Sequence, residues 1–86
     1  MRLDKYLKVS RLIKRRTIAN EACDAGRVLV NSRPARASCE VRPGDVLEIG
    51  LGSRRIRAKV LAVSETAGKD RAGELYEILS ESPGEL

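Results

Sequence analysis

The spacing of apolar residues changes once along this chain, at Gly26, from that of helices to that of strands. Leu3, Tyr6 and Leu7 recur three and four residues apart, which predicts a helix over residues 2–9. Beyond Gly26, short runs of alternating apolar and polar residues are separated by turn residues, as is typical of strands. The order of these patterns predicts an α+β domain in which two N-terminal helices pack on a small, mainly antiparallel sheet.

The second helix is delimited by a capping residue and a glycine. Thr17 is a residue type favoured at the N-cap, and the small apolar pattern after it continues to Ala25. Gly26 suits the position after a helix, where a left-handed backbone is needed and glycine adopts it without steric penalty. We therefore expect this helix to start after Thr17 and to end near Ala25.

Turn residues divide the second part of the chain into short strands. The predicted strands cover residues 28–30, 46–49, 56–62 and 75–79, residues 35–41 form a short strand or an extended arm, and residues 64–73 form a loop. Pro34 places its segment at an edge, because proline cannot donate to a ladder. Pro43 and Gly44 predict a type II turn. Asn31-Ser32 replaces the usual Asn-Gly of a hairpin, so the turn type there stays open.

Composition excludes several classes of function. The 86 residues include no His, Phe or Trp, which removes histidine-dependent catalysis and leaves an aliphatic core. No two aspartates have a recognisable catalytic spacing, so we expect neither an enzyme nor a cofactor. Cys23 and Cys39 lack partner ligands and are expected to be free thiols that pack as small apolar residues. The longest apolar run is four residues, which predicts no membrane span and a cytoplasmic protein.

Positive charge is concentrated at the start of the chain. Residues 1–42 carry eleven Lys and Arg against four Asp and Glu, whereas residues 43–86 carry six against eight. The cations of the first sixteen residues are Arg2, Lys5, Lys8, Arg11, Lys14, Arg15 and Arg16, and Asp4 is the one acid among them. Such a concentration points to a polyanionic partner rather than to an ordinary solvated helix face. A DNA-binding helix-turn-helix is an alternative, although the strand that begins at Val28 opposes it.

Four segments in a fixed order resemble the RNA-binding domain of the S4 type, named after the fourth small-subunit ribosomal protein. They are RLDKYL at residues 2–7, Arg11 with KRRT at 14–17, GRVLVN at 26–31 and VRPGD at 41–45. The resemblance implies an S4-type domain over residues 1–50. The apolar pattern predicts that residues 51–79 form a strand pair completing the same domain, and the few apolar side chains of residues 80–86 predict a flexible tail. The resemblance also implies that the seven N-terminal cations form the RNA-binding face.

Two groups with a free-standing domain of this kind are similar to this chain. One is the family of ribosome-associated quality-control factors named RqcP, and the other is the fifteen-kilodalton heat-shock protein, which recycles free large subunits carrying nascent chains. The heat-shock protein has a basic C-terminal extension, whereas this sequence ends in SESPGEL, so the first group is favoured. That resemblance implies binding to large-subunit rRNA and the P-site tRNA of the large ribosomal subunit. It further implies cooperation with the RqcH protein in alanine tailing, and a monomer off the ribosome.

Overall fold

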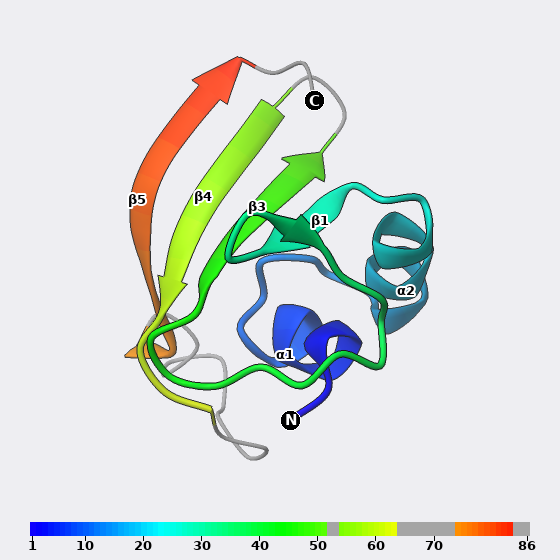
Figure 1. Cartoon of the computed structure of the whole chain (residues 1–86), viewed down its shortest axis with the longest axis horizontal. Coiled ribbons are helices and arrows are strands. Elements are labelled where there is room, and N and C mark those ends of the chain that lie inside the picture. Colours follow the sequence, from blue (N-terminus) through cyan, green and yellow to red (C-terminus); the bar gives the residue numbers. More distant parts are fainter. Residues whose placement is uncertain (52–53, 64–73, 84–86) are drawn as a thin grey trace.

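The structure is a computed structural model, and it describes residues 1–51, 54–63 and 74–83. Within these ranges it contains two helices, α1 (Leu3–Val9) and α2 (Arg16–Asp24), and five strands. The strands are β1 (Val28–Val30), β2 (Arg33–Pro34), β3 (Val46–Leu51), β4 (Arg54–Val60) and β5 (Tyr76–Pro83). They form one antiparallel sheet in the order β2-β1-β3-β4-β5. Both helices lie beside the β1 part of the sheet, and β5 forms its far edge (Figure 1). The predicted α+β class is confirmed.

The first turn of α1 is held by the extended arm between β2 and β3. The N-cap of α1 is Arg2, whose side chain makes no capping hydrogen bond. Instead, the backbone amide of Leu3 donates to the carbonyl of Cys39 over 2.7 Å, and that of Asp4 donates to the carbonyl of Ala37 over 3.1 Å. The first N–H groups of a helix have no partner within the helix, so the arm supplies acceptors that a capping side chain would otherwise provide. The sequence predicts a short strand or an extended arm over residues 35–41, and the structure shows the extended arm.

Both helices end on a residue with left-handed backbone. Gly26 follows α2 with φ of 76°, and its amide donates to the Cys23 carbonyl while the Arg27 amide donates to that of Ala22, which completes a Schellman motif. The predicted role of Gly26 is confirmed. Arg11 occupies the equivalent position after α1 with φ of 62°, and its amide donates to the Lys8 carbonyl over 3.0 Å. An arginine thus stands where glycine is the favoured residue.

The start of α2 differs from the prediction. The sequence predicts Thr17 as the N-cap, but the N-cap is Arg15 and the helix begins at Arg16. Arg15 has an extended backbone with φ of −125° and makes no side-chain capping bond. Thr17 is exposed within the first turn. What holds this end of the helix is the Arg16 side chain, which is anchored on α1, and a contact between two elements is invisible to a capping pattern.

The turns of the sheet follow the sequence closely. Gly44 has φ of 95°, and the Asp45 amide donates to the Arg42 carbonyl over 3.1 Å, as a type II turn requires. Asn31 and Ser32 both have positive φ, 52° and 69°, between paired strands β1 and β2. The open question is thereby answered, because two positive φ values in a two-residue loop define the type I′ turn.

The core joins the two ends of the chain. Its fully buried apolar side chains include Leu3, Leu7, Val28, Leu47, Ile49 and Val60. Tyr6 is also fully buried, and its hydroxyl donates to the carbonyl of Leu75 over 2.6 Å. Burial raises the pKa of this phenol, with a further contribution from nearby Tyr76. Helix α1 is therefore packed against the segment that leads into the last strand.

Strand β5 is longer than the sequence suggests. It runs to Pro83 and pairs with all of β4, with a shift of register between Arg57 and Ala58. The expected flexible tail from Ser80 is therefore wrong for residues 80–83, whose backbone continues the sheet despite a polar sequence. The remaining tail residues 84–86 and the loop expected at 64–73 lie outside the described residues. None of the helices in the described part could cross a membrane.

Candidate nucleic-acid interface

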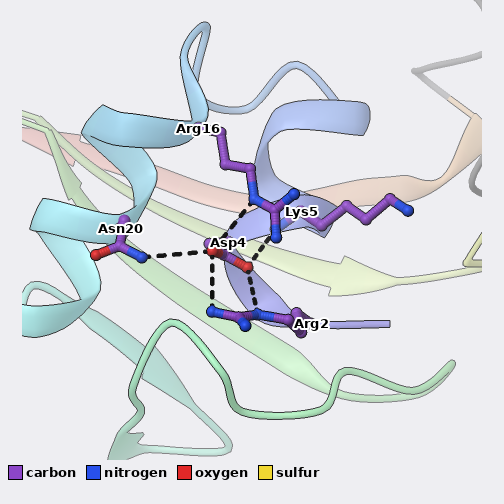
Figure 2. A network of polar contacts seen from close by, with 5 residues as sticks. All are labelled: Arg2, Asp4, Lys5, Arg16 and Asn20. Carbon is purple, nitrogen blue, oxygen red and sulfur yellow. Dashed lines mark hydrogen bonds and ion pairs between the residues drawn. The ribbon is translucent and has the colours of Figure 1, made fainter.

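A buried carboxylate organises the basic N-terminal segment. Asp4, in the first turn of α1, is 2% exposed. Figure 2 shows Arg2, Arg16 and Asn20 directed at Asp4, while the long side chain of Lys5 points away from it. Arg2 Nε lies 3.2 Å from Asp4 Oδ1, and Arg16 Nε lies 3.3 Å from Oδ2. Asn20 Nδ2 and the Lys5 backbone amide also donate to this carboxylate. We name Arg2, Asp4, Arg16 and Asn20 the Asp4 cluster.

These donors keep Asp4 ionised. Burial on its own raises the pKa of the Asp4 carboxyl, but hydrogen bonds from Arg16, the Lys5 backbone, Arg2 and Asn20 together outweigh it and leave the pKa below its ordinary value. One carboxylate thus faces two guanidinium groups, and the cluster keeps a net positive charge. The arginine side chains are themselves about half exposed, 52% for Arg2 and 48% for Arg16. Their contacts with Asp4 use both Nε atoms and one terminal nitrogen of Arg2, so further N–H groups can reach an external acceptor.

A groove lies over the Asp4 cluster. It has a volume of about 520 Å³ and is lined by Met1, Arg2, Lys5, Arg16, Ser38 and Glu40. It therefore brings together three of the seven predicted cations from α1, α2 and their flanks. Glu40 is the one acid in this lining, and it is exposed and paired with Arg42 over 3.2 Å. The groove has the charge and the donors needed to bind an anion.

The other four predicted cations lie along α1 and the segment between the helices. Lys14 and Arg15 line a second depression, next to Leu12, Ile13 and Ile18. Lys8 and Arg11 are exposed, at the end of α1 and just after it, and line neither of these hollows. The fold thus places three of the seven predicted cations at the groove, two at the second depression and two outside both.

Two members of the cluster do not appear among the predicted site residues. Asp4 reads from the sequence as a simple helix-end residue, although it is the one acid among seven cations, and that isolation is the signal that could have identified it. Asn20 lies sixteen residues from Asp4 and has no comparable signal in the sequence. Both support the arginines, so the site depends on residues that themselves carry no positive charge.

Basic side chains on the sheet have a different setting. On β4, Arg55 pairs with Glu48 over 3.2 Å and Arg54 pairs with Glu81 over 3.3 Å. Lys59 lies opposite Glu77 in the register of β4 and β5. These cations face acids at close range on neighbouring strands. The first sixteen residues, by contrast, carry seven cations and one acid.

The comparisons with known proteins point to one domain type. The family model of the S4 domain matches residues 1–47, which span both helices and the arm. The "RQC P-site tRNA stabilizing factor" of Halalkalibacterium halodurans is 49% identical over 83 residues, which cover 96% of this chain and 94% of the relative. The "Heat shock protein 15 homolog" of Haemophilus influenzae is 33% identical over 78 residues, covering 90% of this chain and 60% of that protein.

A solved structure has the same fold. The trimeric structure of Vibrio cholerae heat shock protein 15 superimposes with a TM-score of 0.85 at 27% identity, covering 93% of this chain and 82% of that one. The similarity therefore includes the strands beyond the region that the domain model matches.

Proposed function

The chain belongs to the S4-domain family and, within it, to the RQC P-site tRNA stabilizing factors, and from this premise we propose that it is a non-enzymatic RNA-binding factor of ribosome-associated quality control. It binds obstructed large ribosomal subunits through rRNA and the P-site tRNA. There it supports the RqcH-dependent alanine tailing of stalled nascent chains. It acts in the cytoplasm, and it is a monomer off the ribosome.

The observation that carries this proposal is the convergence of Arg2 and Arg16 on the buried Asp4. The carboxylate is buried while the two guanidinium groups stay about half exposed, so their N–H groups that are not bonded to Asp4 remain accessible. A planar guanidinium can bridge two oxygens of a phosphate, so an arginine with a fixed orientation binds it with little loss of side-chain entropy. The cluster thus supports two phosphate sites at one end of a small rigid domain.

The remaining cations extend this contact surface. Lys5, Lys8, Arg11, Lys14 and Arg15 flank the cluster on α1 and on the segment that follows it. An A-form RNA helix offers phosphates and 2′-hydroxyls rather than readable base edges in its deep groove, so spaced cations on a rigid frame suit it. We therefore assign all seven residues to the RNA-binding face, with Arg2 and Arg16 at its centre.

The heat-shock type of recycling factor is the second candidate, favoured by the fold shared with the Vibrio cholerae protein. The sequence similarity favours the quality-control factor. The identity to the Halalkalibacterium halodurans factor is 49% along 94% of its length, whereas the identity to the heat-shock relative is 33% along 60% of its length. The two functions differ in their dependence on RqcH. A reconstitution with and without RqcH therefore separates them.

The first experiment is sedimentation of the tagged protein with separated ribosomal subunits. We expect it to migrate with large subunits that hold peptidyl-tRNA and to be lost from them in the Arg2→Ala, Arg16→Ala double variant. Arg54→Ala is the control, because Arg54 is also an exposed arginine paired with an acid, but on the sheet. Equal binding to small subunits would contradict the proposal.

The second experiment is a reconstitution of tailing from stalled large subunits, RqcH and alanyl-tRNA. With this protein present, we expect longer alanine tails on the nascent chain than without it. The Arg16→Ala protein should support shorter tails than wild type. Tails of the same length with and without the protein would exclude the quality-control assignment while leaving the S4 fold intact.

A further inference from the structure

An apolar depression lies between the helices, beside the Asp4 cluster but separate from it. It has a volume of about 470 Å³ and is lined by Leu12, Ile13, Lys14, Arg15 and Ile18. Ile13 is buried and Leu12 is half-buried, so both form a fixed floor that packs on the core. Ile18, in the first turns of α2, is 47% exposed.

The exposure of Ile18 is unusual for its position. The large apolar residues exposed in the described part of the chain are Ile18, Leu61, Val63, Ile78 and Leu79. Four of them lie in β5 or just after β4, and Ile18 alone lies in the helical half, among Lys14, Arg15 and Arg16. An exposed isoleucine gives no benefit to solubility or to a salt-dependent contact. A ligand that has both an apolar part and a negative charge would use both features.

We propose that this depression binds one unpaired nucleotide of the RNA, with its base and ribose against Ile18 and Leu12 and its phosphates at Lys14 and Arg15. The inference rests on the proposed function, because it adds a second subsite to the same RNA-binding face. Unpaired nucleotides can leave the stack and place their flat apolar faces on protein side chains, which paired ones cannot do. Aliphatic side chains take this role here because Leu12, Ile13 and Ile18 are the apolar residues of the lining.

Charge complementarity favours RNA over a protein segment as the occupant. The lining of the depression contains no acid, and its two polar residues, Lys14 and Arg15, are both cations. The next residue along the chain, Arg16, belongs to the groove over the Asp4 cluster, so the two hollows are contiguous in sequence. An acidic protein segment with apolar residues is the competing occupant, and the test below includes it.

The test compares two RNA probes of equal phosphate number by fluorescence anisotropy. One is a stem–loop with an unpaired loop, and the other is a blunt duplex. We expect Ile18→Ser to weaken binding of the stem–loop by about fivefold, as for partial loss of one buried aliphatic side chain, and to leave the duplex within twofold. The slope of log affinity against log salt should not change, because an apolar contact releases no counterions. Lys14→Ala should instead weaken both probes and reduce that slope.

Ile78→Ser is the matched control, because Ile78 is 43% exposed on β5, an edge strand of the sheet, and does not line the depression. It should leave both probes unchanged, and far-ultraviolet circular dichroism should show that both variants are folded. Equal effects of Ile18→Ser on the two probes, or no effect on either, would overturn the inference. The same assay with an acidic, leucine-containing peptide tests the competing occupant. The inference would also be overturned if Ile18→Ser lost binding to this peptide while its RNA binding stayed intact. Failure of the proposed function would differ, because the wild-type protein itself would then not bind large subunits.

Discussion

Arg16 Nε lies 3.3 Å from Asp4 Oδ2, so the first residue of α2 is held by a carboxylate in the first turn of α1. The contact spans twelve residues of sequence and fixes both a helix junction and the direction of an exposed guanidinium. Asp4 Oδ1 likewise fixes the direction of the Arg2 guanidinium, whose Nε lies 3.2 Å away. A single buried acid thus determines how the proposed RNA-binding face is presented.

Replacing this acid should weaken RNA binding even though the net charge becomes more positive. In Asp4→Asn one of the two acceptor oxygens becomes an NH2 group that faces donors, so the side chain can no longer orient both Arg2 and Arg16. We expect affinity for the large subunit to fall several-fold, and the free energy of unfolding to fall by about 1–3 kcal/mol. Filter binding and urea unfolding measure the two effects. A rise in affinity would show that total charge matters more than orientation.

The same variant should have an altered dependence of stability on pH. The pKa of Asp4 is lower in the folded protein than its ordinary value of 3.8, so the ionised carboxylate stabilises the fold above that pH. This contribution is lost as the pH falls below 3.8 and through the folded pKa. We therefore expect the stability difference between wild type and Asp4→Asn to be full at pH 7 and to shrink on acidification toward pH 3. A difference that stayed constant over this range would contradict the pKa shift.

Salt dependence tests the number of phosphate contacts. If the face neutralises about five phosphates, log affinity should fall against log salt with a slope of about −3.5 to −4.5. Removing Arg2 and Arg16 together should make that slope shallower by about 1.4 to 1.8. The control Arg54→Ala should leave it unchanged. A wild-type slope near zero would exclude a polyanion as the partner.

Arg11 should contribute to binding at a cost in stability. Its φ of 62° is a conformation that costs an L-residue about 1–2 kcal/mol and that glycine adopts freely. We expect Arg11→Gly to raise the free energy of unfolding, by up to about 1 kcal/mol after the greater flexibility of unfolded glycine is counted, and to weaken RNA binding. Arg11→Ala keeps the unfavourable φ and removes the charge, so it should weaken binding without the gain in stability. Denaturant titration of the three proteins distinguishes these outcomes.

The two thiols should differ in reactivity. Cys23 is buried in the core, and burial raises the pKa of its thiol to about 11, helped by the neighbouring charges of Asp4 and Asp24. Cys39 lies half-buried in the arm. Iodoacetamide at pH 8 should therefore label Cys39 in the folded protein and reach Cys23 only after unfolding, as read by mass spectrometry. Labelling of both at equal rates would contradict the burial of Cys23.

Much of this fold follows from local sequence signals. The remaining parts could not be predicted, because they depend on contacts between distant segments. The helical spacing at Leu3 and Leu7 and the turn residues Gly26 and Gly44 each act within a few residues, so their predictions are confirmed. The anchoring of α1 on the arm uses backbone carbonyls, which have no side-chain pattern. Strand β5 continues through polar residues because β4 supplies its hydrogen-bonding partners.

The site shows the same division. The cations are visible in the composition of the first sixteen residues, and so is a polyanionic partner. Which of them line a hollow depends on how α1, α2 and the segment between them are arranged, which no periodicity encodes. Asp4 and Asn20 belong to the site only because α1 and α2 bring them together.

The hydrogen bond from Tyr6 to the Leu75 carbonyl has a consequence for how the protein is made. Synthesis delivers the N-terminal end first, but the α1 core is completed by a residue 69 positions later. A growing chain that has not yet reached Leu75 leaves the Tyr6 hydroxyl without this acceptor, so we expect α1 and Arg2 at its start to be less firmly held. Contacts of such high sequence separation form late, after most of the chain is available. We therefore expect the domain to reach its full stability only when its own translation is nearly finished.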